Sequence, residues 1–348
     1  MSEPTSPFSG NLETTHPHEV WIIQPSRRRL WIHIVLLLAT FITTMAVGSR
    51  IQSNFEHRQP TFSISEDGPF FPVDWITHPS ELLSGLPFSL TLMFILLAHE
   101  MGHYVYSRKY HVYATLPYFV PFPSLIGTLG AFIRIKSPIP SRPALFDIGI
   151  AGPIAGFIPA CIALLLGLSR SQPIASGNVS SLQLGFPLAF QGAARLLQIT
   201  TPLSSLSLHP IAAAAWVGLF ATALNLLPGG QLDGGHIIFS GAPGLHRTVS
   251  FLTVLALIPL GKYFWTGWLL WAVLLAMTAR HPPVPDKASI SGGRRWIALF
   301  GAIMLMLSFT PAPFTHSSGQ EVWPELRREG RQAFHEAIES IRHRLHRK

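Results

Sequence analysis

The sequence predicts an all-α, polytopic membrane protein with about six or seven transmembrane helices. Hydrophobic residues make up 48% of the chain and charged residues only 12%, a balance that is unusual for a water-soluble protein. The apolar residues gather into runs long enough to cross a hydrocarbon layer of about 30 Å. Lysines and arginines concentrate in the loops on one side of these runs, as expected for a multi-pass protein.

The first expected span follows three arginines, Arg27, Arg28 and Arg29, and lies too far into the chain for an ordinary cleavable signal peptide. We therefore interpret it as a retained anchor. The charge bias favours an N-terminus on the inner side, a bacterial cytoplasm or its topological equivalent. Seven apolar runs are expected spans, of which the fifth is short: 30–48, 86–106, 144–168, 210–227, 249–260, 263–278 and 296–309.

Polar segments flank the expected membrane domain. Residues 1–29 are rich in Ser, Thr, Pro and His and are expected to form a disordered tail. Residues 30–310 would form the transmembrane domain, and residues 311–348 a polar C-terminal tail. The net charge of +8 is scattered among apolar runs without a basic domain, so we expect the lipid bilayer, and no nucleic acid, as a partner.

A small membrane-associated β-element is expected between the second and third spans. The segment 110–143 is rich in proline, and its middle, 126–136, alternates in a way that favours a strand or hairpin over a helix. Nonhelical backbone at membrane depth is tolerated only against protein or in a wet cavity, so such a strand would line a site. The alternative is an ordinary proline-rich loop.

The main candidates for metal-binding and catalytic residues are in the HEMGH sequence at 99–103, which continues the apolar run of the second span. On a helix, His99 and His103 at i and i+4 lie on one face and can bind one metal ion. Glu100 lies beside them and can accept a proton from a nucleophilic water. Ionisable side chains inside a membrane span are costly, by roughly 2 to 3 kcal/mol each, and a bound metal would compensate for them.

A third ligand is expected from the NLLPGGQLDGGH sequence at 225–236, because zinc usually has three protein ligands and an open position. Asp233 is the main candidate, although it could instead cap a helix. His236 could replace Asp233 as a ligand, donate a hydrogen bond to one, or be a polar residue without a metal role. Asn225 could donate a hydrogen bond to a substrate carbonyl or only bond neighbouring helices. The expected topology brings both motifs to the inner side.

Together, the HEMGH and NLLPGGQLDGG motifs resemble the site-2 protease family of intramembrane zinc metalloproteases. The glycine-rich segment 146–156 is similar to the helix that packs between the two motif helices in that family. The chain looks most like the short bacterial and plastid members. It departs from many bacterial relatives, which carry a PDZ domain between the motif segments, because no loop here is long enough for one; substrate screening by such a domain is therefore not expected. The resemblance extends over about 86–280 and the His-Pro-Pro stretch that follows.

The resemblance implies a set of roles for residues of this chain. One Zn²⁺ per chain would be held by His99, His103 and Asp233. Glu100 would be the catalytic base, and Asn225 would position substrate. The strand near 127–135 would pair with an unwound substrate, which makes its first residues, Gly127, Thr128, Leu129 and Gly130, expected substrate contacts.

The predicted function is hydrolysis of peptide bonds in or near the transmembrane segments of single-span membrane proteins, either in regulated intramembrane proteolysis or in clearance of membrane peptides. A transporter is disfavoured because transport does not require the HExxH order. A catalytically silent binding protein of the same fold is disfavoured because Glu100 and all expected ligands are retained. A membrane zinc protease acting on soluble or prenylated peptides is a further alternative.

Overall fold

The computed structural model describes residues 30–63, 71–73, 79–175, 183–286, 288–290 and 292–314. The expected N-terminal tail and nearly all of the expected C-terminal tail lie outside these residues. Within them the fold is mainly helical, with two small two-stranded sheets. The helices are α1 (Leu30–Glu56), η2 (Pro79–Gly85), α2 (Leu86–Lys109), α3 (Arg142–Leu168), α4 (Leu188–Leu196), η3 (Leu203–Ser205), α5 (Pro210–Asn225), α6 (Asp233–Gly241), α7 (Pro243–Tyr263), α8 (Gly267–Met277) and α9 (Gly292–Ser308).

Four helical stretches among the described residues are long and apolar enough to cross a membrane, namely α1, η2 with α2, α3 and α7. They confirm the prediction of a helical, integral membrane protein. The apolar helices α5 and α8 have 16 and 11 residues, and at 1.5 Å per residue they extend only about 24 and 16 Å. Helix α8 is shorter than the expected run because Phe264–Thr266 form the turn from α7. The finer count of six or seven spans stays a prediction.

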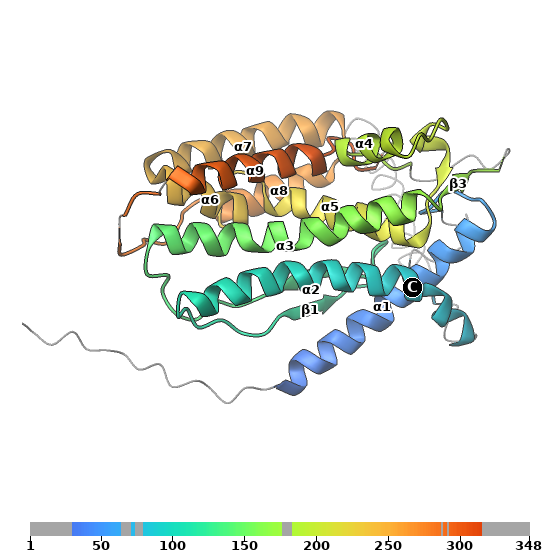
Figure 1. Cartoon of the computed structure of the whole chain (residues 1–348), viewed down its shortest axis with the longest axis horizontal. Helices are drawn as coiled ribbons and strands as arrows, with labels where there is room; N and C mark the ends of the chain where they lie inside the picture. The colour runs from blue at the N-terminus through green and yellow to red at the C-terminus, as the bar shows by residue number, and fades with distance from the viewer. Residues whose placement is uncertain are drawn as a thin grey trace, which may run out of the picture.

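Helix α3 lies at the centre of the bundle, against α2, α5 and α6 (Figure 1). Small residues let these helices approach closely. A methyl group added at Gly102 of α2 would overlap the backbone of Ala151 of α3, and one added at Gly167 would overlap Ala212 of α5. The glycine-rich third span therefore packs between the two motif-bearing segments, as the resemblance implied.

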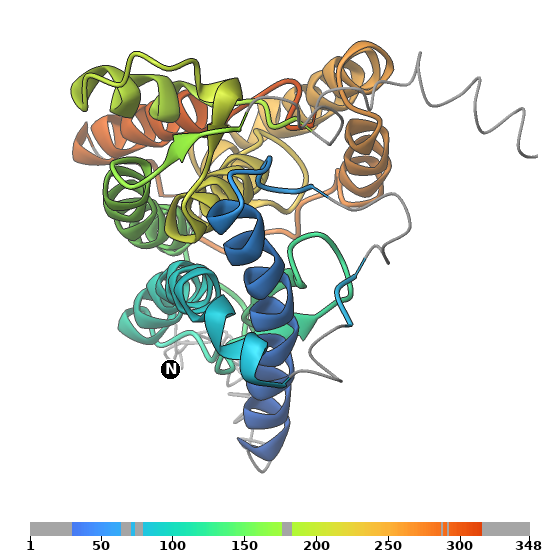
Figure 2. The ribbon, with the colours of Figure 1, turned by 90° about the vertical axis from the view of Figure 1, so that its right-hand side faces the viewer.

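The expected β-element is a hairpin. Strands β1 (Tyr118–Pro121) and β2 (Thr128–Phe132) are antiparallel, and an isolated bridge between Ala114 and Ile135 continues the pairing. Helix α1 packs against β1 and crosses in front of the hairpin in Figure 2. At the turn, the Thr43 hydroxyl of α1 donates a 2.7 Å hydrogen bond to the carbonyl of Gly127. The hairpin is thus held between α1 and the motif helix α2.

The structure also contains a second sheet that we did not expect. Strands β3 (Gln172–Pro173) and β4 (Leu206–Ser207) pair antiparallel near α4. Strands of two residues leave no alternating pattern in the sequence, which explains why they escaped prediction.

Candidate metal centre

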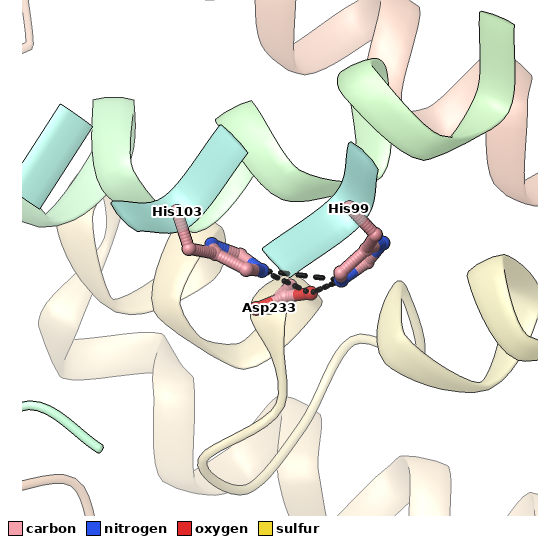
Figure 3. A group of neighbouring side chains, drawn as sticks. All are labelled: His99, His103 and Asp233. Carbon is pink, nitrogen blue, oxygen red and sulfur yellow. Dashed lines mark hydrogen bonds and ion pairs between the residues drawn. The ribbon is translucent and has the colours of Figure 1, made fainter. Parts of the chain in front are cut away.

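His99 and His103 lie on one face of α2, as predicted from their spacing (Figure 3). Both side chains are buried, and their Nε2 atoms are 3.1 Å apart. Glycines of α3 provide the space that the two rings occupy. An added methyl group would overlap the ring of His103 at Gly152 and would press on His99 at Gly156. The close approach of α3 to α2 therefore fixes both imidazoles between the two helices.

Asp233 is the first residue of the short helix α6, directly after the turn that follows α5. Helix α7 holds this turn, because the Gly230 amide donates to the Ser250 hydroxyl at 3.0 Å and its carbonyl lies 2.9 Å from His246 Nε2. Gly230 has a φ of +59°, a left-handed conformation that favours glycine. The turn thereby brings the Asp233 carboxylate back to α2.

The three side chains form a compact triangle of possible ligand atoms. Asp233 Oδ2 lies 3.3 Å from Nε2 of His99 and 3.3 Å from Nε2 of His103. A tetrahedral zinc with bonds of about 2.0 to 2.1 Å separates its ligand atoms by roughly 3.3 Å. Two imidazole nitrogens and one carboxylate oxygen are also a donor set that zinc accepts, with a fourth position left open. The geometry therefore fits one zinc ion held by these three residues.

A backbone carbonyl fixes the orientation of one imidazole. His103 Nδ1 lies 2.7 Å from the carbonyl oxygen of Ile148 in α3. Because a carbonyl only accepts hydrogen bonds, Nδ1 must carry the hydrogen. The lone pair of Nε2 is then directed toward Asp233 and His99, which is the tautomer that a metal requires.

Glu100 is buried beside the triangle, with 6% of its surface exposed. The backbone of Ile133, just after β2, lies within hydrogen-bonding reach of its carboxylate. The amide nitrogen of Asn225, at the end of α5, lies 3.3 Å from His99 Nε2. Thus Glu100 and Asn225 both lie next to the three candidate ligands, on different elements.

The four expected substrate contacts lie at the turn of the hairpin and in β2. Gly127 packs against α1, and the hydroxyl of Thr128 donates to the carbonyl of Val120 inside the hairpin at 2.8 Å. Leu129 is 67% exposed. The hairpin residue that reaches Glu100 is Ile133, further along the chain than the expected contacts.

Sequence reasoning missed Ile133 and Ile148, because both act through backbone groups that any residue type would provide. The alternation around 131–135 was the only signal for Ile133. His236 lies outside the three-residue group, and its Nδ1 is 2.8 Å from Nε2 of His281. It therefore does not replace Asp233 in the triangle.

The region that contains these residues matches a known protein family. A family model, Peptidase family M50, matches residues 87–258, which include the HEMGH sequence, the glycine-rich helix and Asp233. This chain belongs to peptidase family M50. The resemblance to site-2 proteases is therefore confirmed.

Proteins named as chloroplastic are among the proteins similar to this chain. The probable zinc metalloprotease EGY1 of Arabidopsis thaliana is 29% identical over 88% of this chain and 56% of its own length. The probable zinc metalloprotease EGY2 of the same plant is 31% identical over 69% of this chain and 44% of its own length. The chain thus spans about half the length of these curated relatives.

Proposed function

We propose that this chain is an intramembrane zinc metalloprotease, which hydrolyses peptide bonds in or near the transmembrane segments of single-span membrane proteins. The main support is the triangle of ligand atoms, with sides of 3.1, 3.3 and 3.3 Å, beside a buried glutamate. Helix α2, which carries His99 and His103, is long and apolar enough to cross a membrane. The two similar plant proteins are also named probable zinc metalloproteases.

In this proposal His99, His103 and Asp233 hold one zinc ion per chain. When bound, zinc would activate a water molecule at neutral pH and polarise the substrate carbonyl. Glu100 accepts the proton of the attacking water and delivers it to the amine that leaves. Asn225 donates a hydrogen bond to the carbonyl oxygen as negative charge develops there.

The substrate must be locally unwound before cleavage, because a helix keeps its carbonyl groups in its own hydrogen bonds. We infer that the edge of β2 pairs with the unwound segment, through the backbone from Gly127 to Gly130 and on to Ile133. The contact between Ile133 and Glu100 supports this role, since it places the end of the strand beside the proposed base. Regulated proteolysis and clearance of membrane peptides are both compatible with such a site.

For the membrane, we propose that the N-terminus and the active site face the inner side, which is the cytoplasm for a bacterial inner membrane. The support is the bias of loop cations, including Arg108 and Lys109 at the end of α2. The plant relatives are named as chloroplastic, so an equivalent orientation in a chloroplast membrane follows from the same charge pattern.

The test is cleavage of a panel of single-span model substrates by purified protein in detergent. Wild type is compared with Glu100→Gln and with Glu81→Gln, a control on the exposed surface of η2. We expect cleavage by wild type and the control, no cleavage by Glu100→Gln, and about one zinc ion per chain in all three. A wild-type protein that binds no zinc would overturn the proposal, and zinc binding without cleavage of any substrate would favour a silent binding protein.

A further inference from the structure

A second group of histidines lies behind the metal-binding triangle. His236 of α6 and His281, in the segment after α8, are joined by a 2.8 Å contact between Nδ1 and Nε2. The other nitrogen of His281, Nδ1, lies 2.7 Å from the carbonyl oxygen of Pro282. These three groups form a short chain of hydrogen bonds, which we call the histidine ladder.

The segment of the ladder that carries His281 is fixed in place. The His281 ring stacks on Phe239 of α6, with ring centroids 3.9 Å apart and planes inclined by 14°. The side-chain amide of Gln231 also donates to the carbonyl of the preceding residue, Arg280, at 3.1 Å. Both contacts hold the segment around His281 against residues near Asp233. The two stretches are far apart in the sequence.

The ladder determines where the hydrogens lie. Because the Pro282 carbonyl only accepts, Nδ1 of His281 carries a hydrogen. Burial lowers the pKa of His281, so the ring is neutral near pH 7 and its Nε2 is an acceptor. His236 must then donate from Nδ1, which leaves its own Nε2 with a free lone pair and no hydrogen.

The ring of His236 lies close to the metal-binding triangle. Asp233 lies one turn earlier on α6, and its carbonyl oxygen would lie 3.6 Å from a methyl group added at Gly149 of α3. The Cβ of His236 packs against α3, where a methyl group added at Gly149 would lie 3.1 Å away. In the tautomer set by the ladder, Nε2 cannot donate to the Asp233 carboxylate, because both atoms are acceptors. Among the described residues His236 makes its side-chain hydrogen bond through Nδ1, so the lone pair of Nε2 can accept a hydrogen bond from a bound substrate.

An unwound peptide substrate provides such donors. Each residue in the extended segment exposes a backbone N–H, which is costly to leave without a partner in a site shielded from water. In the proposed mechanism Glu100 transfers the proton, and the three residues of the triangle bind the metal. His236 is a neighbouring side chain whose Nε2 can accept such a hydrogen bond.

We propose that His236 positions the substrate by accepting a hydrogen bond from its backbone N–H at Nε2, and that His281 is the positioning residue that fixes the required tautomer. The inference rests on the proposed protease function. In this proposal His236 contacts the substrate and does not bind the metal. His281 acts through its Nε2, which accepts the hydrogen bond from His236.

The experiment compares wild type with His236→Ala, His281→Ala, His281→Gln and the control His57→Ala, an exposed histidine in the turn just after α1. Zinc content, kcat and KM are measured for a substrate that wild type cleaves. We expect kcat/KM to fall about 10- to 100-fold in both alanine variants, mostly through KM, with zinc retained. In His281→Gln, the side-chain amide oxygen can accept the hydrogen bond from His236. This variant should therefore keep most of the wild-type kcat/KM.

A second readout reports the ladder without any cleavage. Nitrogen NMR of ¹⁵N-labelled histidines should show His236 with hydrogen on Nδ1 in wild type and a shift toward hydrogen on Nε2 in His281→Ala. The proposal is overturned if either alanine variant keeps the wild-type kcat/KM, if His281→Gln is as impaired as His281→Ala, or if His236→Ala loses its zinc. If wild type shows the expected tautomer but cleaves nothing, the protease function fails and the substrate role fails with it, whereas the ladder itself stands.

Discussion

Replacing Gly152 with alanine should disrupt the metal centre from the opposite helix. A Cβ built at this position lies within 2.5 Å of three atoms of the His103 ring. Non-bonded carbon atoms normally approach to about 3.5 to 4.0 Å, so the ring would have to move by about 1 Å or more. The hydrogen bond from His103 to the Ile148 carbonyl, 2.7 Å long, opposes that movement.

The size of the effect follows from the tolerance of the site. Zinc–ligand distances vary by only about 0.2 Å, so a displaced imidazole loses its place in the triangle. We expect zinc affinity and cleavage to fall by at least about 10- to 100-fold, by analogy with loss of the groups that orient metal ligands. Crowding should also lower stability by about 1 to 3 kcal/mol.

Two glycine-to-alanine variants should change the stability of the protein in opposite directions, which makes the test specific. In an open helical position, glycine to alanine stabilises by about 0.5 to 1 kcal/mol. Gly192, within α4, offers a matched control because nothing lies within 4 Å of an added methyl group. Zinc per chain, substrate cleavage and thermal unfolding in detergent would be measured for both variants. Full zinc and wild-type cleavage in Gly152→Ala would refute the reasoning.

Three further predictions concern the surroundings of the site. Asp147→Asn should lower the unfolding temperature by an amount equivalent to about 1 to 3 kcal/mol, because Arg294 of α9 binds that carboxylate through two nitrogens at 2.7 and 2.8 Å. The control Arg295→Ala, at an exposed position, should change the unfolding temperature little. Gly127→Ala should destabilise more than Gly130→Ala, by about 1 to 3 kcal/mol in thermal unfolding, because both have positive φ but only the methyl at Gly127 would meet α1, at 2.6 Å from a carbonyl oxygen. A zinc chelator should abolish cleavage and lower the unfolding temperature, and added Zn²⁺ should restore both, because the triangle exists only in the folded state.

The residues of the candidate centre were accessible from sequence because their signals are local. The i, i+4 spacing of His99 and His103 places two imidazoles on one face wherever the segment is helical. The proline and glycines before Asp233 predict a break that can return the chain toward the metal. The alternation near Ile133 likewise predicts a strand, because the side-chain period of a strand is two residues.

The ends of the helices were harder to predict from the sequence. Apolar runs indicate where helices can lie in a membrane, but the turn between α7 and α8 depends on how the two helices pack. A hydropathy run does not distinguish an 11-residue helix from a full span when turn residues such as Phe264 and Trp265 are themselves apolar. The two-residue strands β3 and β4 have no pattern at all.

The sequence by itself determined the family, the helical membrane class and the side chains that can bind a metal. Only the tertiary structure decided that three ligand atoms lie within 3.3 Å of one another, that Ile148 orients His103, and that Ile133 reaches Glu100. Only the tertiary structure joined His281 to His236. The physical reason is that backbone groups carry no residue-type signal, and that distances between segments far apart in the chain depend on how closely the helices pack.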